Sequence, residues 1–294
     1  MAHPPILRSK IAEEELYKLY WKDNLKIKDI ASMYGVTYSA VWRYMDKLGI
    51  NRRGYSETRV LHYSVKRVNE NFFSNCSREV AYVLGVIITD GSIDSASGNL
   101  RISMTDKDVV EKIALVMELE DGISIVKARN GGKQQYKLAI CRQKITEDLR
   151  HLGVEIDGSK TFDQKAIKVP KEFRSHFIRG VFDGDGSLVI RNRISPAGTP
   201  YKSSDVTIVS ASKPFLDSVL NMLNEDLDLG LHINGYMGNK STKILYRINF
   251  SCRKKIGKFL RYIYKDKGNV FMERKYNKAI TDGAYMMNND TLLS

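Results

Sequence analysis

The apolar positions of this 294-residue chain follow one pattern near its start and another through the rest. Residues 10–50 carry apolar side chains at helical spacing, in short blocks separated by polar residues and Gly35. From residue 77 onward, long apolar helical stretches are followed by segments in which apolar and polar side chains alternate, as in half-buried strands. The pattern therefore predicts a small helical domain followed by a larger α+β region.

The pattern of the larger region occurs twice. Each copy contains an apolar helix, a hairpin, a second helix, a second hairpin and a closing helix. We therefore predict an α+β fold with two pseudo-symmetric αββαββα halves, residues 77–158 and 159–294. A small all-α domain over residues 1–54 and a linker over residues 55–76 precede them. The first strand is expected to begin at Ser92. The other expected strands cover Leu100–Met104, Ile123–Arg129, Gln134–Cys141, Leu188–Arg193, Val206–Ser210, Leu231–Met237 and Ile244–Phe250.

The N-terminal domain is expected to contain three helices, Ala12–Lys22, Lys26–Tyr34 and Tyr38–Leu48. Thr37 is a suitable N-cap for the third helix, because its hydroxyl accepts a bond from a backbone N–H that lacks a partner. The domain resembles a helix-turn-helix, which implies that the third helix enters the major groove of double-stranded DNA. An ordinary helical hairpin is the alternative. The residues expected to contact DNA on this helix are Tyr38, Ser39, Trp42 and Arg43.

Arg52 and Arg53 follow the third helix in an extended segment beside Gly54. Two arginines in such a segment are expected to reach a minor groove or a run of phosphates. A plain charged linker is the alternative.

Each half of the larger region begins with an apolar helix that ends in Asp-Gly, within Glu79–Ser92 and Phe173–Ser187. A glycine lies five residues before each of these acids, at Gly85 and Gly180. A glycine inside a helix costs about 1 kcal/mol relative to alanine, so it is favoured only where another backbone comes close. We therefore predict that the two helices cross with these glycines facing each other.

The two acids, Asp90 and Asp185, are expected to lie side by side at the C-terminal ends of the crossed helices. The helix dipole disfavours a carboxylate there, and two carboxylates repel each other. A divalent metal ion with oxygen ligands is therefore expected between them. The alternative is that the acids only cap and solvate the helix ends. Gly91 and Gly186, which follow the acids, are expected to end the helices in the left-handed conformation.

The segments Val83–Gly91 and Ile178–Gly186 resemble the two signature motifs of a single-chain LAGLIDADG homing endonuclease. The first copy departs from the family pattern at Ile88, where an acid is common, and at Thr89, where a small residue is usual. The resemblance covers residues 77–282. It implies a monomeric, site-specific DNA endonuclease that uses Mg²⁺ or Mn²⁺ to make a staggered double-strand break across the minor groove.

The resemblance also implies roles for particular residues. The two motif acids, Asp90 and Asp185, would be catalytic and would bind the metal, which activates water for phosphodiester hydrolysis. The backbone carbonyls of Thr89 and Gly184 are expected as further metal ligands. Members of the family usually have a basic residue near each metal. The basic residues selected by position after the last helix of each half are Lys160 and Lys275.

The strands are expected to present a basic face to DNA. Half of a strand's side chains point away from the core, and in a sheet covered by helices on one face these should be polar. Curved sheets in both halves would then form a saddle for double-stranded DNA, with phosphate contacts from Lys and Arg and base contacts from Arg and Gln. Each residue taken alone is more often an ordinary solvated charge, and alternation alone does not decide which face it takes. The candidates are Arg101, Ser103, Lys127, Arg129, Lys133, Gln135, Lys137, Arg191, Arg193, Lys202, Lys240, Lys243 and Arg247.

The composition agrees with a polyanionic partner. Lys and Arg number 47 against 34 Asp and Glu, for a net charge of +13; a generically basic soluble protein is the alternative. Three cysteines without zinc spacing predict reduced thiols in an intracellular, cytoplasmic protein. The sequence has no apolar run of membrane-spanning length and no recognisable signal or transit peptide, although an organellar location stays open.

Three functions are compatible with these features, and the endonuclease is favoured. A DNA-binding transcription regulator on the same fold is the second, but related regulators tend to have lost the motif acids, and both are present here. An RNA-splicing maturase is the third, which would bind RNA independently of the acids. An intein is disfavoured, because the sequence opens with Met1 and ends without a His-Asn pair.

Overall fold

The computed structural model describes residues 11–54, 67–94, 98–119, 123–126, 132–155, 164–237 and 244–282. The chain divides into two compact units, Met1–Val65 and Lys66–Ser294. Each unit has its own hydrophobic core, and the two are described separately below.

The N-terminal unit contains the three expected helices. Its elements are α1 (Glu13–Tyr17), which continues as the π-helical η2 (Lys18–Lys22), α2 (Ile27–Met33) and α3 (Tyr38–Lys47). Leu16, Ile30, Val41 and Met45 are fully buried, which places one apolar face of each helix in a shared core. The Thr37 hydroxyl accepts a hydrogen bond from the Ala40 backbone N–H at 3.2 Å, so the predicted N-cap of α3 is confirmed.

The C-terminal unit has the predicted duplicated α+β architecture. Two four-stranded antiparallel sheets have the strand orders β1-β2-β4-β3 and β5-β6-β8-β7, so each half repeats the same topology. The first half comprises α5 (Arg78–Asp90), β1 (Gly91–Asp94), β2 (Asn99–Met104), α6 (Lys107–Val116), β3 (Ile123–Val126), β4 (Gln135–Cys141) and α7 (Gln143–His151). The second comprises η4 (Lys171–Phe173), α8 (Arg174–Asp185), β5 (Gly186–Ile194), β6 (Pro200–Ser210), α9 (Lys213–Leu227), β7 (Ile233–Met237), β8 (Ile244–Phe250), α10 (Arg253–Tyr264) and α11 (Glu273–Asp282).

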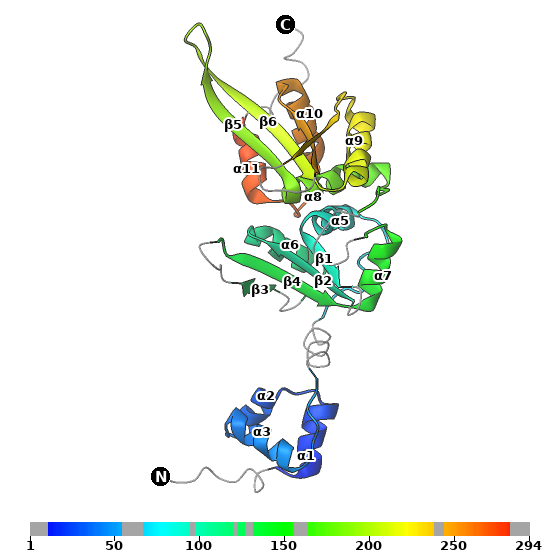
Figure 1. Cartoon of the computed structure of the whole chain (residues 1–294), viewed down its shortest axis with the longest axis vertical. Coiled ribbons are helices and arrows are strands. Elements are labelled where there is room, and N and C mark those ends of the chain that lie inside the picture. The colour runs from blue at the N-terminus through cyan, green and yellow to red at the C-terminus, as the bar shows by residue number, and fades with distance from the viewer. Residues whose placement is uncertain are drawn as a thin grey trace. The chain divides into compact units, whose positions relative to one another are not determined.

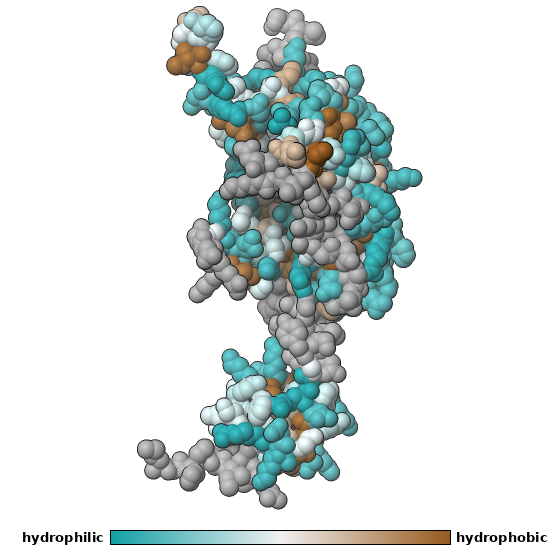
Figure 2. All heavy atoms as spheres, viewed as in Figure 1, coloured by the Kyte–Doolittle hydropathy of each residue, from teal (hydrophilic) through white to brown (hydrophobic). Residues whose placement is uncertain are grey.

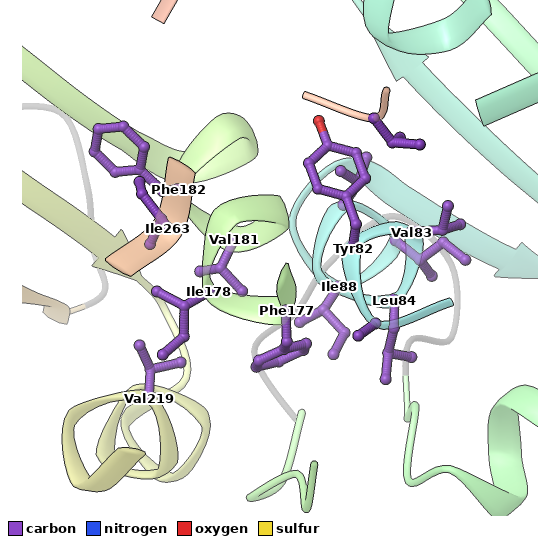
Figure 3. Close-up of a cluster of buried hydrophobic side chains, with 14 of the residues drawn as sticks. Tyr82, Val83, Leu84, Ile88, Phe177, Ile178, Val181, Phe182, Val219 and Ile263 are labelled. Atoms are coloured by element: carbon purple, nitrogen blue, oxygen red, sulfur yellow. The ribbon is translucent and has the colours of Figure 1, made fainter. Parts of the chain in front are cut away.

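Helices α5 and α8 lie side by side between the two sheets (Figure 1). Every residue from Val80 to Ile88 is buried, and α8 is buried from His176 to Asp183. Figure 3 shows the apolar side chains of both helices around their crossing, among them Leu84 and Phe177. Because a neighbouring helix and a sheet cover each of them, both helices are buried on nearly all sides. The buried stretch of α5 is apolar throughout, whereas α8 also buries His176, Arg179 and Asp183.

The strands alternate between core and outer faces as predicted. In the first sheet Leu100, Ile102 and Leu138 are buried, while Arg101 and Lys137 alternate with them on the other face. One pairing differs from the expectation, because β6 begins at Pro200 rather than Val206 and extends the β5–β6 hairpin. The surface in the view of Figure 2 is mostly hydrophilic, with apolar atoms gathered at the tip of this hairpin, where Ile194 is 74% exposed.

The linker predicted over residues 55–76 is partly folded onto the first half. Residues 67–76 belong to the C-terminal unit, where the Asn69 N–H donates to the Met117 carbonyl at 2.9 Å and Phe73 is buried. Arg142 also pairs with Glu70 at 2.6 Å. The sequence of this segment has no regular hydrophobic period, because isolated contacts such as these hold it in place rather than one apolar face. None of the helices described is long and apolar enough to cross a membrane.

Candidate functional site

The two central helices cross at glycine, as predicted. A Cβ atom added to Gly85 would lie 2.8 Å from the Val181 backbone nitrogen and would also collide with the Phe177 carbonyl oxygen. A Cβ atom added to Gly180 would lie 3.1 Å from the Gly85 Cα and would collide with the Tyr82 carbonyl oxygen. Backbone therefore packs directly on backbone, which no residue with a side chain permits.

Gly91 and Gly186 end the helices in a different way from the prediction. Their φ and ψ angles are −90° and 165°, and −89° and 159°, so both glycines are extended rather than left-handed. Glycine is required instead because the chain turns straight into β1 or β5 against the last helical turn. A Cβ atom on Gly91 would lie 2.9 Å from the Ile87 Cα, and one on Gly186 would lie 2.8 Å from the Phe182 Cα.

The crossing brings Asp90 and Asp185 together from positions far apart in the chain. A Cβ atom on Gly184 would lie 2.5 Å from Asp90 Oδ2 and 2.6 Å from Thr89 Cβ, so the end of α5 lies against the end of α8. The negative charge of Asp90 also acts directly on the Asp185 carboxyl. The predicted pairing of the two acids is therefore present in the fold.

Both carboxyls are held in unfavourable surroundings for a negative charge. Burial raises the pKa of Asp90 to about 6, against the opposing effects of a 3.2 Å hydrogen bond from the Thr89 hydroxyl and the charge of Lys275. Burial by neighbouring protein atoms and the charge of Asp90 raise the pKa of Asp185 to about 7. Asp185 is nevertheless exposed to solvent, so water screens much of this effect.

Lys275 of α11 lies beside the site, but its ammonium group binds backbone. The Nζ atom donates to the carbonyl oxygens of Phe182 at 2.5 Å, Asp183 at 2.8 Å and Gly186 at 2.6 Å. These bonds satisfy carbonyls at the C-terminal end of α8 and place a positive charge where the helix dipole favours one. Burial lowers the pKa of Lys275 to about 8. In this structure Lys275 positions the end of α8.

Asp183 lies in a buried polar network behind the site. Its Oδ2 atom accepts hydrogen bonds from the Tyr82 hydroxyl and the Met272 N–H, both at 2.8 Å. Tyr82 belongs to α5, and Met272 precedes α11, so one carboxylate ties three segments together. The sequence gives no signal for these partners, because they come together only when the helices cross.

A second pair of residues joins the halves near Asp90. Arg274 donates to both oxygens of Asp106, from Nε at 2.9 Å and from a terminal nitrogen at 3.0 Å, across 168 residues of sequence. The negative charge of Asp106 also contributes to the raised pKa of Asp90. Asp106 directly precedes α6 but makes no cap hydrogen bond there, because Arg274 occupies its carboxylate. We call this pair of Asp106 and Arg274 the clasp, and the sequence gives no signal for it.

The residues at the helix ends suit a divalent cation. Among the residues that the structure describes, no Lys, Arg or His nitrogen forms an ion pair with Asp90 or Asp185, and the nearby charge of Lys275 offsets only part of their mutual repulsion. Paired carboxylates and backbone carbonyls are the oxygen donors that Mg²⁺ and Mn²⁺ favour. The same part of the chain contains no cluster of three or more His, Cys, Asp or Glu side chains. Among the His, Cys, Asp and Glu side chains described, Asp90 and Asp185 would therefore be the only metal ligands at this place.

The predicted DNA-facing residues of the first half share one face of its sheet. Arg101 lies opposite Ser92 and Ala139, and Ser103 lies opposite Lys137, all on the side of the sheet away from Leu100, Ile102 and Leu138. Gln135 begins β4, and Lys133 is exposed just before it. Lys127, Arg129 and Lys160 lie outside the described residues.

In the second half the basic residues do not all share a face. Arg191, Arg193 and Arg247 occupy outer positions of the sheet. Lys202 is exposed, lies opposite Asn192 and alternates onto the same face as buried Val206, so it does not share the face of Arg191. Arg191 pairs with Asp205, which neutralises part of its charge. Lys240 and Lys243 lie outside the described residues.

The predicted contact residues of the N-terminal unit lie on the outer side of α3. Tyr38 is 52% exposed, and Ser39, Trp42 and Arg43 are exposed with it. Arg52 and Arg53 do not extend away from the unit. The Arg52 guanidinium stacks on Trp42 at 3.8 Å and pairs with Asp46 at 3.0 Å. The Arg53 guanidinium stacks on Tyr20 at 4.0 Å.

The C-terminal unit belongs to a known family. The family model of the LAGLIDADG-like domain matches residues 77–152 and 172–264, which is more than half of the chain and includes one copy of the motif in each half. The chain is therefore a member of the LAGLIDADG-like domain family, with two repeats of the fold in one polypeptide.

Individual relatives are distant. The chain is 28% identical over 111 residues to one of the subunits of the A-type ATP synthase of Methanopyrus kandleri, covering 38% of this chain and 10% of that protein. It is 23% identical over 231 residues to a probable translation initiation factor IF-2 of Thermococcus kodakarensis, covering 76% of this chain and 17% of that protein. The chain thus spans less than a fifth of either relative.

One similar solved structure is the I-SmaMI LAGLIDADG homing endonuclease bound to cleaved DNA. It is 13% identical, with a TM-score of 0.46, and the match covers 75% of this chain and 92% of that one.

Proposed function

We propose that the chain is a site-specific DNA endonuclease that cuts both strands of double-stranded DNA by metal-dependent phosphodiester hydrolysis. The observation that supports this most is the meeting of Asp90 and Asp185 at the crossed helix ends. Their pKa values are raised to about 6 and about 7, so the metal-free fold holds two carboxylates where ionisation is unfavourable. The charge of Lys275 offsets only part of this cost, and a purely structural role offers no further compensation.

In this proposal Asp90 and Asp185 bind Mg²⁺ or Mn²⁺, with the backbone carbonyls of Thr89 and Gly184 as further oxygen ligands. The metal supplies charge neutralisation and activation of water for attack on a phosphodiester. Asp90 and Asp185 would hold the metal, and the close backbone packing at the glycine crossing keeps the two helix ends side by side. Lys275 keeps the end of α8 in position through its three carbonyl contacts.

The outer faces of the two sheets are the proposed DNA-binding surface. Arg101, Lys137, Arg193 and Arg247 supply positive charge on these faces, and Gln135 supplies a side chain able to read base edges. The overall charge of +13 favours association with a polyanion. A monomer is sufficient, because one chain contains both halves of the site.

A DNA-binding regulator is the second candidate function. The exposed face of α3 in the N-terminal unit favours it, since a three-helix unit with exposed Tyr38, Trp42 and Arg43 suits groove recognition without cleavage. In that case both motif acids would be dispensable for the function, and DNA would be bound but not cut. An RNA-splicing role would instead appear as tight RNA binding that also survives loss of the acids.

The test is cleavage of a plasmid library carrying random inserts, with Mg²⁺ and with a chelator. The wild type should give discrete double-strand cuts with Mg²⁺ and none with the chelator. Asp90→Asn/Asp185→Asn should bind DNA without cutting it, whereas Asp228→Asn, the same chemical change at an exposed left-handed residue, should cut normally. Binding without cleavage by the wild type would instead favour the regulator.

A further inference from the structure

A pocket in the N-terminal unit combines positive charge with aromatic walls. It encloses about 360 Å³ between the first helical stretch, the starts of α2 and α3, and the tail that follows α3. Four basic side chains and two tyrosines line it, and no acidic side chain does so within the described residues. These residues are Lys26, Lys28, Arg52, Arg53, Tyr20 and Tyr38.

The tail is fixed across the unit, so the pocket exists before any ligand binds. The Arg53 backbone N–H donates to the Tyr20 hydroxyl at 3.0 Å, and its guanidinium donates to the Leu25 carbonyl at 3.3 Å. The same guanidinium stacks on the Tyr20 ring at 4.0 Å. Arg52 is held from outside the pocket by Trp42 and Asp46. Ordering these long side chains during folding lowers the entropy lost on binding.

One donor of Arg53, a residue that lines the pocket, has no partner. The Nε–H of Arg53 is buried and makes no hydrogen bond to any of the residues that the structure describes. A buried donor without an acceptor is unfavourable, and an anionic oxygen is the acceptor that a guanidinium favours most. Asp46 balances Arg52, but no acid pairs with Lys28 or Arg53 in the described part of the chain. The pocket therefore selects an anion.

We propose that this pocket receives one backbone phosphate, with its adjoining sugar, from the duplex that α3 contacts. The proposal rests on the proposed DNA binding of the chain. A volume of about 360 Å³ exceeds that of a bare phosphate and lies at the small end of ligand pockets. Tyr38 belongs both to the pocket and to the exposed face of α3, so a strand lying along α3 passes the pocket opening. Arg53 then binds a phosphate of the DNA strand within the pocket and does not reach into a minor groove.

The test compares Lys28→Gln with Lys22→Gln in the full-length protein. Lys28 lines the pocket, whereas Lys22 is exposed in the same unit outside it, and both changes remove one charge. The probe is the duplex recovered by cleavage, or a random-sequence duplex if nothing is cut. Loss of one phosphate contact should weaken binding about three- to tenfold and reduce the salt slope by about 0.9 for Lys28→Gln only. Equal affinities and slopes for the two variants would overturn the proposal.

A second readout follows Arg53 directly and does not depend on cleavage. The Nε–H resonance of Arg53 should shift when the duplex is added, and also, at higher concentration, with inorganic phosphate alone. A resonance that moves with neither probe contradicts the pocket, even if the wild type cuts DNA. A wild type that cuts nothing contradicts the proposed function, while the shift with inorganic phosphate still decides whether the pocket binds an anion.

Discussion

Asp90 and Asp185 are stabilised in the protonated state by the metal-free fold. Burial dominates both shifts, and the neighbouring carboxylate adds to the shift of Asp185. Each proton must therefore leave before the acid binds a cation, so the affinity for Mg²⁺ should rise as the pH passes through 6 to 7. Lys275 contributes positive charge nearby, but its ammonium group donates its hydrogen bonds to backbone carbonyls.

The stability of the metal-free protein should fall as the pH rises from 5 to 8. The pKa of Asp185 is about 7 in the folded state against 3.8 ordinarily, so over this range the folded state retains a proton that the unfolded state has lost. Asp185→Asn cannot titrate and should be more stable than wild type at pH 8, by about 1 kcal/mol after allowing for solvent screening. Thermal unfolding in a chelator at several pH values measures this. Parallel pH profiles for wild type and variant would contradict it.

Lys275→Met should destabilise the protein by about 2–3 kcal/mol, because buried carbonyls at the end of α8 lose their donor. Lys278→Met, an exposed lysine on the same helix, is the matched control and should have little effect. Denaturant unfolding gives the free energies, and cleavage is measured alongside. If Lys275→Met abolished cleavage with unchanged stability, Lys275 would act on the reacting groups rather than position α8.

At the scale of elements, the crossing of α5 and α8 was predictable from the sequence. Gly85 and Gly180 occupy equivalent places in two apolar helices, and only a close backbone approach explains both. Gly91 and Gly186 were misjudged, because a glycine after a helix indicates a left-handed end in general, and the direct passage into a strand is a tertiary constraint. The face of Lys202 could not be predicted for a similar reason, since the start of β6 depends on pairing with β5.

Gly180→Ala should destabilise the protein by about 2–3 kcal/mol, because the added methyl group collides with the Tyr82 carbonyl and the Gly85 backbone. Gly235→Ala is a suitable control, since its Cβ would meet nothing closer than 3.4 Å and the change should be close to neutral. Chemical denaturation of both variants measures the difference. Unchanged stability in Gly180→Ala would show that the helices are free to move apart.

For the molecule as a whole, the order of elements was predictable but the contacts between halves were not. Alternating strands and repeated helices fix the αββαββα order, because each half follows the same periodicity. The clasp between Asp106 and Arg274 and the network around Asp183 join residues from different halves, and no local pattern marks them. The asymmetry of the site follows from these contacts, since Asp106 acts on Asp90 and is not among the groups that shift the pKa of Asp185.

The clasp should couple Asp106 and Arg274 by about 0.5–1 kcal/mol in a double-mutant cycle of Asp106→Asn and Arg274→Gln. The value is modest because Arg274 is largely exposed, although the pair is bidentate. Removing the charge of Asp106 should also lower the pKa of Asp90, which carboxyl NMR would follow. A coupling near zero together with an unchanged Asp90 pKa would mean that the clasp is incidental.

The proposed function depends above all on Asp90 and Asp185 acting together in a single site that cuts both DNA strands. The most direct measurement is strand-resolved cleavage of a recovered duplex by wild type, Asp90→Asn and Asp185→Asn, with binding measured in parallel. We predict that each variant binds the duplex as wild type does but cuts at least one strand more than about 100-fold more slowly. Cleavage of both strands at the wild-type rate by either variant would contradict the account.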